Sequence, residues 1–541
     1  MSKLFVTVLG TGNYSDCIYY KDDYSLRTPF IQEALINLLY QSKDSKDKLQ
    51  DFDMKILLTE KALQKNYYGP NKLESILKKY NITPELVMIP EGKTSDELWD
   101  IFEKVSETID EAAKKLESPS DTLDVNIDIT HSLRNIPMQI VVAMNYLTLF
   151  NNINLEGIYY GAFELGETKI DDKLFENKDI LDKLYNLDNI DNNILDKLKF
   201  ANSCDDLDDI TQNEILVKSR DYKNCTIKHA PICNLNTYYN LLKWTNAINS
   251  FIKCGNTSEI QQLSSKERAQ AFTFNKQNRK NIKLLDEVIK SLDNFTNCIN
   301  TCRGMNGKKA QDSINSIKVA ADKLYDQLKK LDENISIKPL KKLFKLVSKK
   351  IEPFVDKDNL EIGLATVNWC IEYNLFQQGY TALEETIKTL LCKKLNLDPK
   401  DHPENIYENR EGIVNEILTE AAIKLHGNKE DKNTDIQNNN TKEISDHNVD
   451  SSNNLEKFIE ECSDQLVNTK EFCKLSQAVK AFRNDINHFG FNKDGAKNYT
   501  AIKDNLKLHY SQLLTFIDGE FPWYVPEENT QDEFAIDSSN I

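Results

Sequence analysis

An arginine, an asparagine and a histidine lie close together late in the chain, in the run Arg483-Asn484-Asp485-Ile486-Asn487-His488. The flanking apolar residues repeat at helical spacing, so Asn484 and His488 share one face of a predicted helix and Arg483 lies on an adjoining face. These side chains suit RNA cleavage without a metal. The histidine can move the proton of the attacking 2′-hydroxyl or of the leaving oxygen, the arginine can stabilise charge on the phosphoryl group, and the asparagine can orient either. The alternative interpretation is an exposed helix end.

Polar residues also follow two strands predicted in the first third of the chain. The first group is Gly10-Thr11-Gly12-Asn13-Tyr14, whose glycines let backbone N–H groups approach an anion closely. Since Ser15 stands where a dinucleotide motif has its third glycine, a nicotinamide enzyme is disfavoured. A plain turn after the strand is the alternative interpretation.

The second group is the run Asp128-Ile129-Thr130-His131-Ser132-Leu133-Arg134-Asn135. Its hydroxyls, imidazole, guanidinium and amide are a composition that binds phosphates and bases, and Arg134 suits a phosphate fork. The alternative is that Thr130 or Ser132 only caps the helix that starts near Pro137. Since both groups follow strands of one predicted sheet, we expect them at the same crevice.

Short apolar runs alternate with helical patterns over the first 165 residues. Strands are predicted at 4–9, 54–59, 86–89, 125–130 and 157–163, and helices at 29–40, 71–80, 95–116 and 136–150. This alternation predicts a parallel, doubly wound α/β sheet with its ligand crevice at the carboxyl ends of the strands. From about residue 170 strand-like runs end and the pattern becomes nearly all helical.

Tryptophans and one polar segment refine this picture. Trp99, Trp244 and Trp369 fall within helical apolar patterns and are predicted to be core residues. Residues 427–453 have almost no apolar side chains, which predicts a flexible insert.

The composition limits the class of protein. The chain has 541 residues, 40% of them hydrophobic, and a net charge of −17 that repels nucleic acid and anionic membranes, so a phosphate-rich ligand needs a local cleft. The 11 cysteines form no CxxC pair and the histidines no paired motif, so no metal site is predicted. No apolar stretch approaches the ~18 residues of a membrane span and the start has no signal-peptide pattern, which predicts a cytoplasmic protein.

Together the motifs resemble the type III CRISPR ancillary ribonucleases, which join an N-terminal CARF sensor domain to a C-terminal HEPN nuclease domain. The residues that carry the resemblance are 9–14, 89–94, 128–137, 159–164, Trp369, 377–385 and the Arg483/His488 pair. The resemblance spans most of the chain, with little from 170–230, 255–360 and 427–453. It implies a Rossmann-like α/β CARF domain over 1–170, a helical linker or CARF extension over 171–230, and an all-α HEPN domain over 231–541.

The resemblance implies a homodimeric, metal-independent endoribonuclease of type III CRISPR antiviral defence. A cyclic oligoadenylate, with cyclic tetra-adenylate the expected ring, would bind between two CARF domains and activate cleavage of single-stranded RNA to 2′,3′-cyclic phosphate products. No cofactor, membrane or DNA is implied. By position, His488 would be the acid/base residue, Arg483 the transition-state stabiliser and Asn484 the orienting partner. The expected activator contacts are Thr11, Gly12, Asn13, Tyr14, Lys93, Thr130, His131, Ser132, Arg134 and Asn135.

Alternatives stay open within and beyond this family. The CARF pocket could also degrade its own activator, or the protein could be a non-enzymatic nucleotide-responsive regulator in which Arg483 and His488 are structural. Ser132 and Leu133 replace the glycine and aromatic residue expected after the histidine, which leaves the ring size of the activator open. Assembly beyond the dimer is likewise open.

Overall fold

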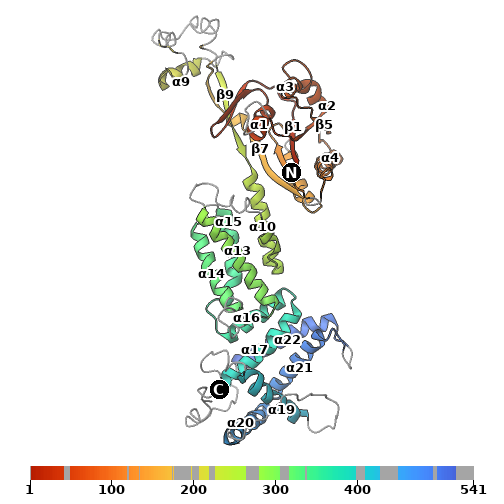
Figure 1. Cartoon of the computed structure of the whole chain (residues 1–541), viewed down its shortest axis with the longest axis vertical. Coiled ribbons are helices and arrows are strands. Elements are labelled where there is room, and N and C mark those ends of the chain that lie inside the picture. Colours follow the sequence, from red (N-terminus) through yellow and green to blue (C-terminus); the bar gives the residue numbers. More distant parts are fainter. Residues whose placement is uncertain are drawn as a thin grey trace. The chain divides into compact units, whose positions relative to one another are not determined.

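The computed structural model divides into two compact units, Met1–Asn240 and Leu241–Ile541 (Figure 1). The residues that it describes are 2–41, 49–118, 121–132, 135–150, 152–172, 175, 197, 201, 206–218, 226–263, 279–304, 316–334, 338–397, 408–426, 449–491 and 496–518.

A nine-stranded sheet forms the centre of the first unit, in the order β3-β2-β9-β7-β6-β1-β4-β5, with β8 paired to β9. The strands are β1 (Ser2–Leu9), β2 (Cys17–Lys21), β3 (Tyr24–Thr28), β4 (Asp53–Leu58), β5 (Glu85–Met88), β6 (Leu123–Asp128), β7 (Ile153–Gly161), β8 (Glu167–Ile170) and β9 (Thr226–Asn234). Strand β1 lies parallel between β4 and β6, and β5 and β7 continue the parallel part on either side. The loops that follow β1, β4, β5 and β6 therefore emerge at one edge of the sheet, formed by the carboxyl ends of its strands.

Helices cover both faces of this sheet. They are α1 (Ile31–Tyr40), α2 (Glu60–Ala62), α3 (Leu73–Lys79), α4 (Ser95–Lys114) and α5 (Ile136–Leu147), with the short turns η1 (Leu63–Tyr67) and η2 (Phe163–Leu165). Helix α9 (Asp209–Lys218) lies instead against β8. Side chains alternate along β1, so Leu4 and Val6 join the cluster under α4 and α5, whereas Phe5 and Leu9 join the cluster under α1 and α3. Burial on both faces explains the continuous apolar runs of these strands.

The second unit is built from helices that surround two apolar clusters. Its elements, with α10 leading in from the first unit, are α10 (Asn236–Cys254), α11 (Ser258–Gln262), α13 (Arg279–Asn300), α14 (Ile317–Asn334), α15 (Lys338–Ile351), η6 (Glu352–Phe354), α16 (Asn359–Glu372), α17 (Phe376–Lys394), η7 (Glu408–Val414), α19 (Asn415–His426), α20 (Val449–Asn468), α21 (Lys470–Asn487) and α22 (Tyr499–Asp518). One cluster gathers residues of α10 to α16, including Trp244 and Trp369. The other gathers residues of α16 to α22, including Tyr380 and Phe472.

The predicted fold class is confirmed: a mostly parallel α/β sheet precedes a largely helical region. The prediction that strands end near residue 170 is wrong, because β9 lies inside the sheet, parallel to β2 and antiparallel to β7. The hairpin of β2 and β3 was also not predicted. Strand β9 contains Lys228, His229 and Pro231 and is only half buried, so its sequence lacks the apolar run that identified the others.

Two further predictions need correction. Trp99 is 70% exposed on α4, whereas Trp244 and Trp369 are buried as predicted. Helical periodicity identifies an apolar face but not whether that face is covered. Residues 449–453 belong to α20, so the predicted insert of 427–453 is too long at its end, and 427–448 lie outside the described residues. Among the described residues, no helix has both the length and the apolar character needed to cross a bilayer.

Candidate functional site

The loop after β1 is folded tightly on itself. The hydroxyl of Tyr14 accepts a hydrogen bond from the Gly10 N–H at 3.0 Å, and the Tyr14 ring stacks on Phe30 with 4.9 Å between centroids. Burial raises the pKa of Tyr14, so its hydroxyl stays protonated. Gly10 is required here because a Cβ atom would lie 2.7 Å from the carbonyl oxygen of His131. The loop thus leaves Thr11, Gly12 and Asn13 exposed while its ends are fixed.

Lys65 and Asn66, in the segment that follows β4, hold this loop in place. The sequence analysis identified neither of them. The buried amide of Asn66 donates to the carbonyl oxygens of Gly10 at 2.7 Å and Gly12 at 3.0 Å. The ammonium of Lys65 donates to the Thr11 carbonyl at 2.7 Å. A signal was present, because Lys65 and Asn66 come shortly after a predicted strand, as the recognised groups do.

The loop after β6 is organised by the buried carboxylate of Asp128. Its Oδ2 accepts from the hydroxyl of Thr7 at 2.6 Å, and its Oδ1 accepts from the Thr130 hydroxyl at 2.5 Å. Burial raises the pKa of Asp128, while these hydrogen bonds oppose that shift. Thr130 also accepts from the Gly161 N–H at 2.8 Å, and Ser132 donates to the Ile129 carbonyl at 2.7 Å. The two hydroxyls predicted to contact a ligand therefore shape the loop.

His131 lies where the first and second loops meet. Its ring contacts the Tyr14 ring edge-on, with centroids 4.4 Å apart. Burial lowers the pKa of His131 to about 4, so the imidazole is neutral at neutral pH. Among the described residues, neither its Nε2 nor the Nδ2 of Asn135 has a hydrogen-bond partner, although both atoms are buried. The hydrogen-bonding capacity of these two buried nitrogens is therefore unused in this structure.

A third loop, after β5, lies at the same edge of the sheet and carries Glu91 and Lys93. Gly92 has a φ of +72°, and a Cβ atom there would lie 3.3 Å from Asn135 Nδ2. Lys61, at 2.5 Å, and Lys93 both form ion pairs with Glu91, and these contacts lower the pKa of Glu91 to about 2. We use the name sensor crevice, after the crevice predicted from the sequence, for the described residues of these three loops: 10–14, 91–94, 128–132 and Asn135. Arg134, the predicted phosphate fork, lies outside the described residues.

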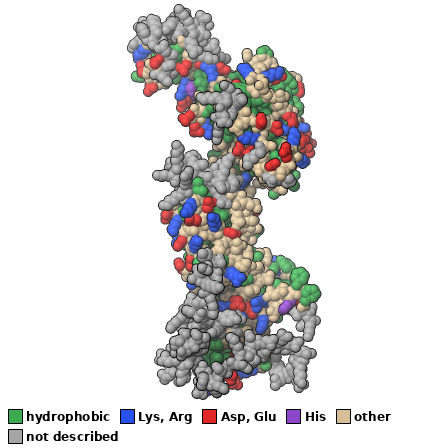
Figure 2. Space-filling view, in the orientation of Figure 1, with side chains coloured by type: hydrophobic (Ala, Val, Ile, Leu, Met, Phe, Trp, Pro, Cys, Tyr) green, Lys and Arg blue, Asp and Glu red, His purple; other side chains and the backbone are tan. Residues whose placement is uncertain are grey.

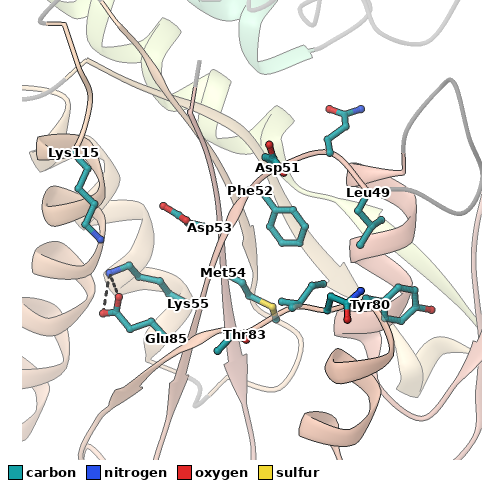
Figure 3. A pocket seen from close by; sticks show the side chains of 13 residues that line it. Leu49, Asp51, Phe52, Asp53, Met54, Lys55, Tyr80, Thr83, Glu85 and Lys115 are labelled. Carbon is teal, nitrogen blue, oxygen red and sulfur yellow. Dashed lines mark hydrogen bonds and ion pairs between the residues drawn. The ribbon is translucent and has the colours of Figure 1, made fainter.

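A separate cavity of about 520 Å³ lies at the opposite edge of the sheet (Figure 3). Its lining includes the starts of β4 and β5, where Lys55 pairs with Glu85 at 2.9 Å. The sensor crevice lies at the carboxyl ends of these strands, so the cavity and the crevice are distinct. The Lys55 ammonium already has a carboxylate partner, and the cavity gives no reason to assign it a function.

The second candidate site is the end of α21. Asn484 is exposed on the last turn, and the exposed His488 is the residue that caps the helix, with its N–H donating to the Asn484 carbonyl at 2.9 Å. Helix α17 packs against α21, and there Gln377 Nε2 donates to Asn487 Oδ1 at 3.3 Å. The structure thus brings Asn484 and His488 to one helix end, as the spacing predicted.

A side chain of α17 holds Arg483 of α21. Its Nη1 donates to Oε2 of Glu384 on α17 at 3.1 Å, and the Glu384 carboxylate is largely buried. The Nε of Arg483 is buried and has no partner among the described residues. We call Arg483, Asn484, His488 and Glu384 the α21 site. Within the described residues, no group of three or more His, Cys, Asp or Glu side chains is arranged to hold a metal ion.

A comparison with known proteins found a distant relative of the chain. No family model matches it. It is 21% identical over 376 residues to the CRISPR-associated protein MJ1674 of Methanocaldococcus jannaschii. The chain is a distant relative of a CRISPR-associated protein. The match covers 66% of this chain and 42% of the relative, so this chain spans less than half of that protein's length.

Proposed function

We propose that this protein is a cyclic-oligoadenylate-activated, metal-independent endoribonuclease that cuts single-stranded RNA in CRISPR defence. The observation that carries the proposal is the α21 site, where an arginine held by a buried carboxylate lies beside an exposed histidine at one helix end. The distant relationship to a CRISPR-associated protein and the separate sensor crevice support it.

The proposed chemistry uses three side chains of the chain. The substrate 2′-oxygen attacks the adjacent phosphorus while the bond from phosphorus to the 5′-oxygen breaks, which leaves a 2′,3′-cyclic phosphate and a 5′-hydroxyl. His488 moves the proton that the 2′-hydroxyl loses or the proton that the 5′-oxygen gains. Arg483 stabilises the charge that collects on the phosphoryl oxygens, and Asn484 orients one of the reacting groups. The partner subunit would supply the second histidine of a composite site.

The proposed activator is a cyclic oligoadenylate, with cyclic tetra-adenylate the expected ring. The exposed backbone of Thr11 to Asn13 would contact its phosphates, and Lys65 and Lys93 would add positive charge. The unpartnered nitrogens of His131 and Asn135 suit the edges of adenine or its ribose hydroxyls. A neutral imidazole at His131 can accept a proton. The alternative that the sensor crevice slowly degrades its own activator therefore stays open.

An apolar surface in the first unit supports the proposed homodimer. On α4, at α5 and just beyond it, the large exposed side chains are Trp99, Met138, Val142, Tyr146, Leu149 and Phe150. Ring contacts join part of this set through Phe102, which lies 5.8 Å from Trp99 and 6.2 Å from Tyr146 between centroids. We call it the α4–α5 face. A contiguous exposed apolar surface of this kind marks an interaction site, and a second copy is the occupant that a symmetric activator requires.

The test is cleavage of a fluorophore-quencher single-stranded RNA in EDTA. Cyclic tri-, tetra- and hexa-adenylate are added separately to wild-type protein and to His488→Ala. One ring that switches on cutting in the wild type only would support sensor, nuclease and activator together. If folded protein cuts under no condition, the nuclease proposal fails and a non-enzymatic, nucleotide-responsive regulator replaces it. Loss of the ring with His488→Ala would indicate degradation in the sensor crevice.

A further inference from the structure

Phe489 lies at a backbone position that disfavours a bulky side chain. Helix α21 ends in a Schellman motif, in which the Phe489 N–H donates to the Ile486 carbonyl at 3.1 Å and the Gly490 N–H donates to the Asp485 carbonyl at 2.8 Å. The first residue after the cap of such a helix adopts positive φ and is usually glycine. Here it is Phe489, with a φ of 57°. A side chain with Cβ is strained in this region, so the fold alone favours glycine.

Packing does not compensate for this strain. Phe489 is 90% exposed and Phe491 is 85% exposed, although large aromatic rings are usually at least partly buried. The Phe491 N–H donates to the His488 carbonyl at 3.0 Å, which folds the chain back toward the helix end. Both rings are thus tethered within three residues of the candidate acid/base group. Figure 2 shows hydrophobic side chains beside a histidine on the surface of the helical unit.

Exposed polar side chains lie next to the two rings. On the helix end next to them, Asn484, Asn487 and His488 are all exposed polar residues. The α4–α5 face, in contrast, gathers six large exposed apolar residues. Exposed aromatic rings close to hydrogen-bonding groups and an arginine fit a ligand in which flat bases alternate with phosphates. Single-stranded RNA has this composition.

We propose that Phe489 and Phe491 form a base-stacking platform that holds the nucleobases flanking the cleaved phosphate next to His488. This proposal rests on the proposed nuclease function. It adds where the protein holds the bases on either side of the cleaved phosphate. Stacking on an aromatic side chain is tolerant of base identity, so the platform would position RNA without strong sequence preference. Loss of one stacked base should lower kcat/KM about five- to a hundred-fold.

The main experiment tests whether the Phe489 side chain and the neighbouring RNA base act together. Activator-dependent kcat/KM is measured on two matched RNAs, one intact and one with an abasic ribonucleotide next to the cleaved phosphate. The proteins are wild type, Phe489→Gly, Phe489→Trp and the control Leu346→Ala, which truncates an apolar side chain on α15 that is 49% exposed. Base removal should lower kcat/KM in the wild type, Phe489→Trp and Leu346→Ala, but should have no further effect in Phe489→Gly. Phe491→Ala is measured in the same way.

Stability separates this role from a structural one. Because glycine relieves the strain, Phe489→Gly should raise the thermal-unfolding midpoint by about 2–4 °C while its activity falls. If Phe489→Gly cleaves both RNAs as the wild type does, the platform is refuted. If Phe489→Gly is a monomer under conditions in which the wild type sediments as a dimer, the rings are contacts between copies, and the proposal is also overturned.

Binding measurements keep the platform and the nuclease proposal distinguishable. Fluorescence anisotropy of the same two RNAs, labelled with fluorescein, is measured with His488→Ala alone and combined with Phe489→Gly. If the wild type cuts nothing but His488→Ala prefers the intact RNA and the double variant does not, the platform stands and the nuclease proposal fails. Equal binding of both RNAs by His488→Ala, or no binding at all, refutes the platform.

Discussion

The amide of Asn66 fixes the shape of the loop that the activator is proposed to contact. Asn66→Ala removes hydrogen bonds of 2.7 Å to the Gly10 carbonyl and 3.0 Å to the Gly12 carbonyl from a side chain that is 2% exposed. Each such bond contributes about 1 kcal/mol, so the free energy that holds the loop in this shape should fall by about 2 kcal/mol. If the activator binds the loop in this shape, it must supply that free energy itself, and its Kd should rise about 30-fold.

A matched control exists in the same unit. Asn37 on α1 also donates two side-chain hydrogen bonds, to the Glu33 carbonyl at 2.9 Å and to the Tyr80 hydroxyl at 3.1 Å, outside the sensor crevice. Asn37→Ala should therefore have a similar effect on the thermal-unfolding midpoint but leave the Kd unchanged. Isothermal titration with cyclic tetra-adenylate gives the affinities. Equal loss of affinity in the two variants, or wild-type affinity in Asn66→Ala, would refute the reasoning.

Three further predictions concern the other sites. Glu384→Gln removes the negative charge that pairs with Arg483 at 3.1 Å. The kcat on RNA should then fall about tenfold or more, with little change in KM. An unchanged kcat would show that the ion pair does not position the arginine. Trp99→Glu places a charge on the α4–α5 face and should convert a dimer to a monomer in sedimentation, whereas Ile210→Glu, at a residue 79% exposed on α9, should not; dimeric Trp99→Glu would contradict that interface. Burial lowers the pKa of His131 to about 4, against about 6.5 in the unfolded chain, so the unfolded state binds more protons between these values. The free energy of unfolding should therefore fall by about 2 kcal/mol from pH 7.5 to pH 5, and the non-titrating His131→Gln should lack this part of the slope in urea titrations.

The central strands were predictable because each is buried on both faces. Strands β1, β4 and β6 read as short apolar runs, and such runs separated by helical patterns indicate a parallel sheet. Strand β9 escaped prediction because only three of its nine residues are fully buried, and its polar residues interrupt the apolar pattern. What decides its position is pairing with β2 and β7, which are distant in the sequence.

The candidate sites were predictable only where their residues are close in the sequence. Arg483 and His488 were found because helical spacing relates neighbours on one helix. Glu384 is 99 positions from Arg483, and Asn66 is 56 positions from Gly10, so only the packing of separate elements brings these partners together. Thr130 shows the reverse limitation: residue type predicted a ligand contact, but its hydroxyl donates to Asp128 and accepts from the Gly161 N–H within the fold.

The charges of the two candidate sites bear on how an acidic chain would select phosphate ligands. In the sensor crevice Glu91 pairs with Lys61 and Lys93, and in the α21 site Glu384 pairs with Arg483. Because Glu91 contacts both lysines, which lower its pKa, an incoming phosphate would compete with that carboxylate for them. A flexible polyanion that offers only charge gains little by replacing the Glu91 carboxylate on these lysines. The net charge of −17 also repels such a polyanion. A ligand whose shape also uses the loop backbone and the buried nitrogens of His131 and Asn135 gains contacts that a polyanion does not. If the proposed activator binds here, the ion pairs of Lys61 and Lys93 favour selection by shape over selection by charge.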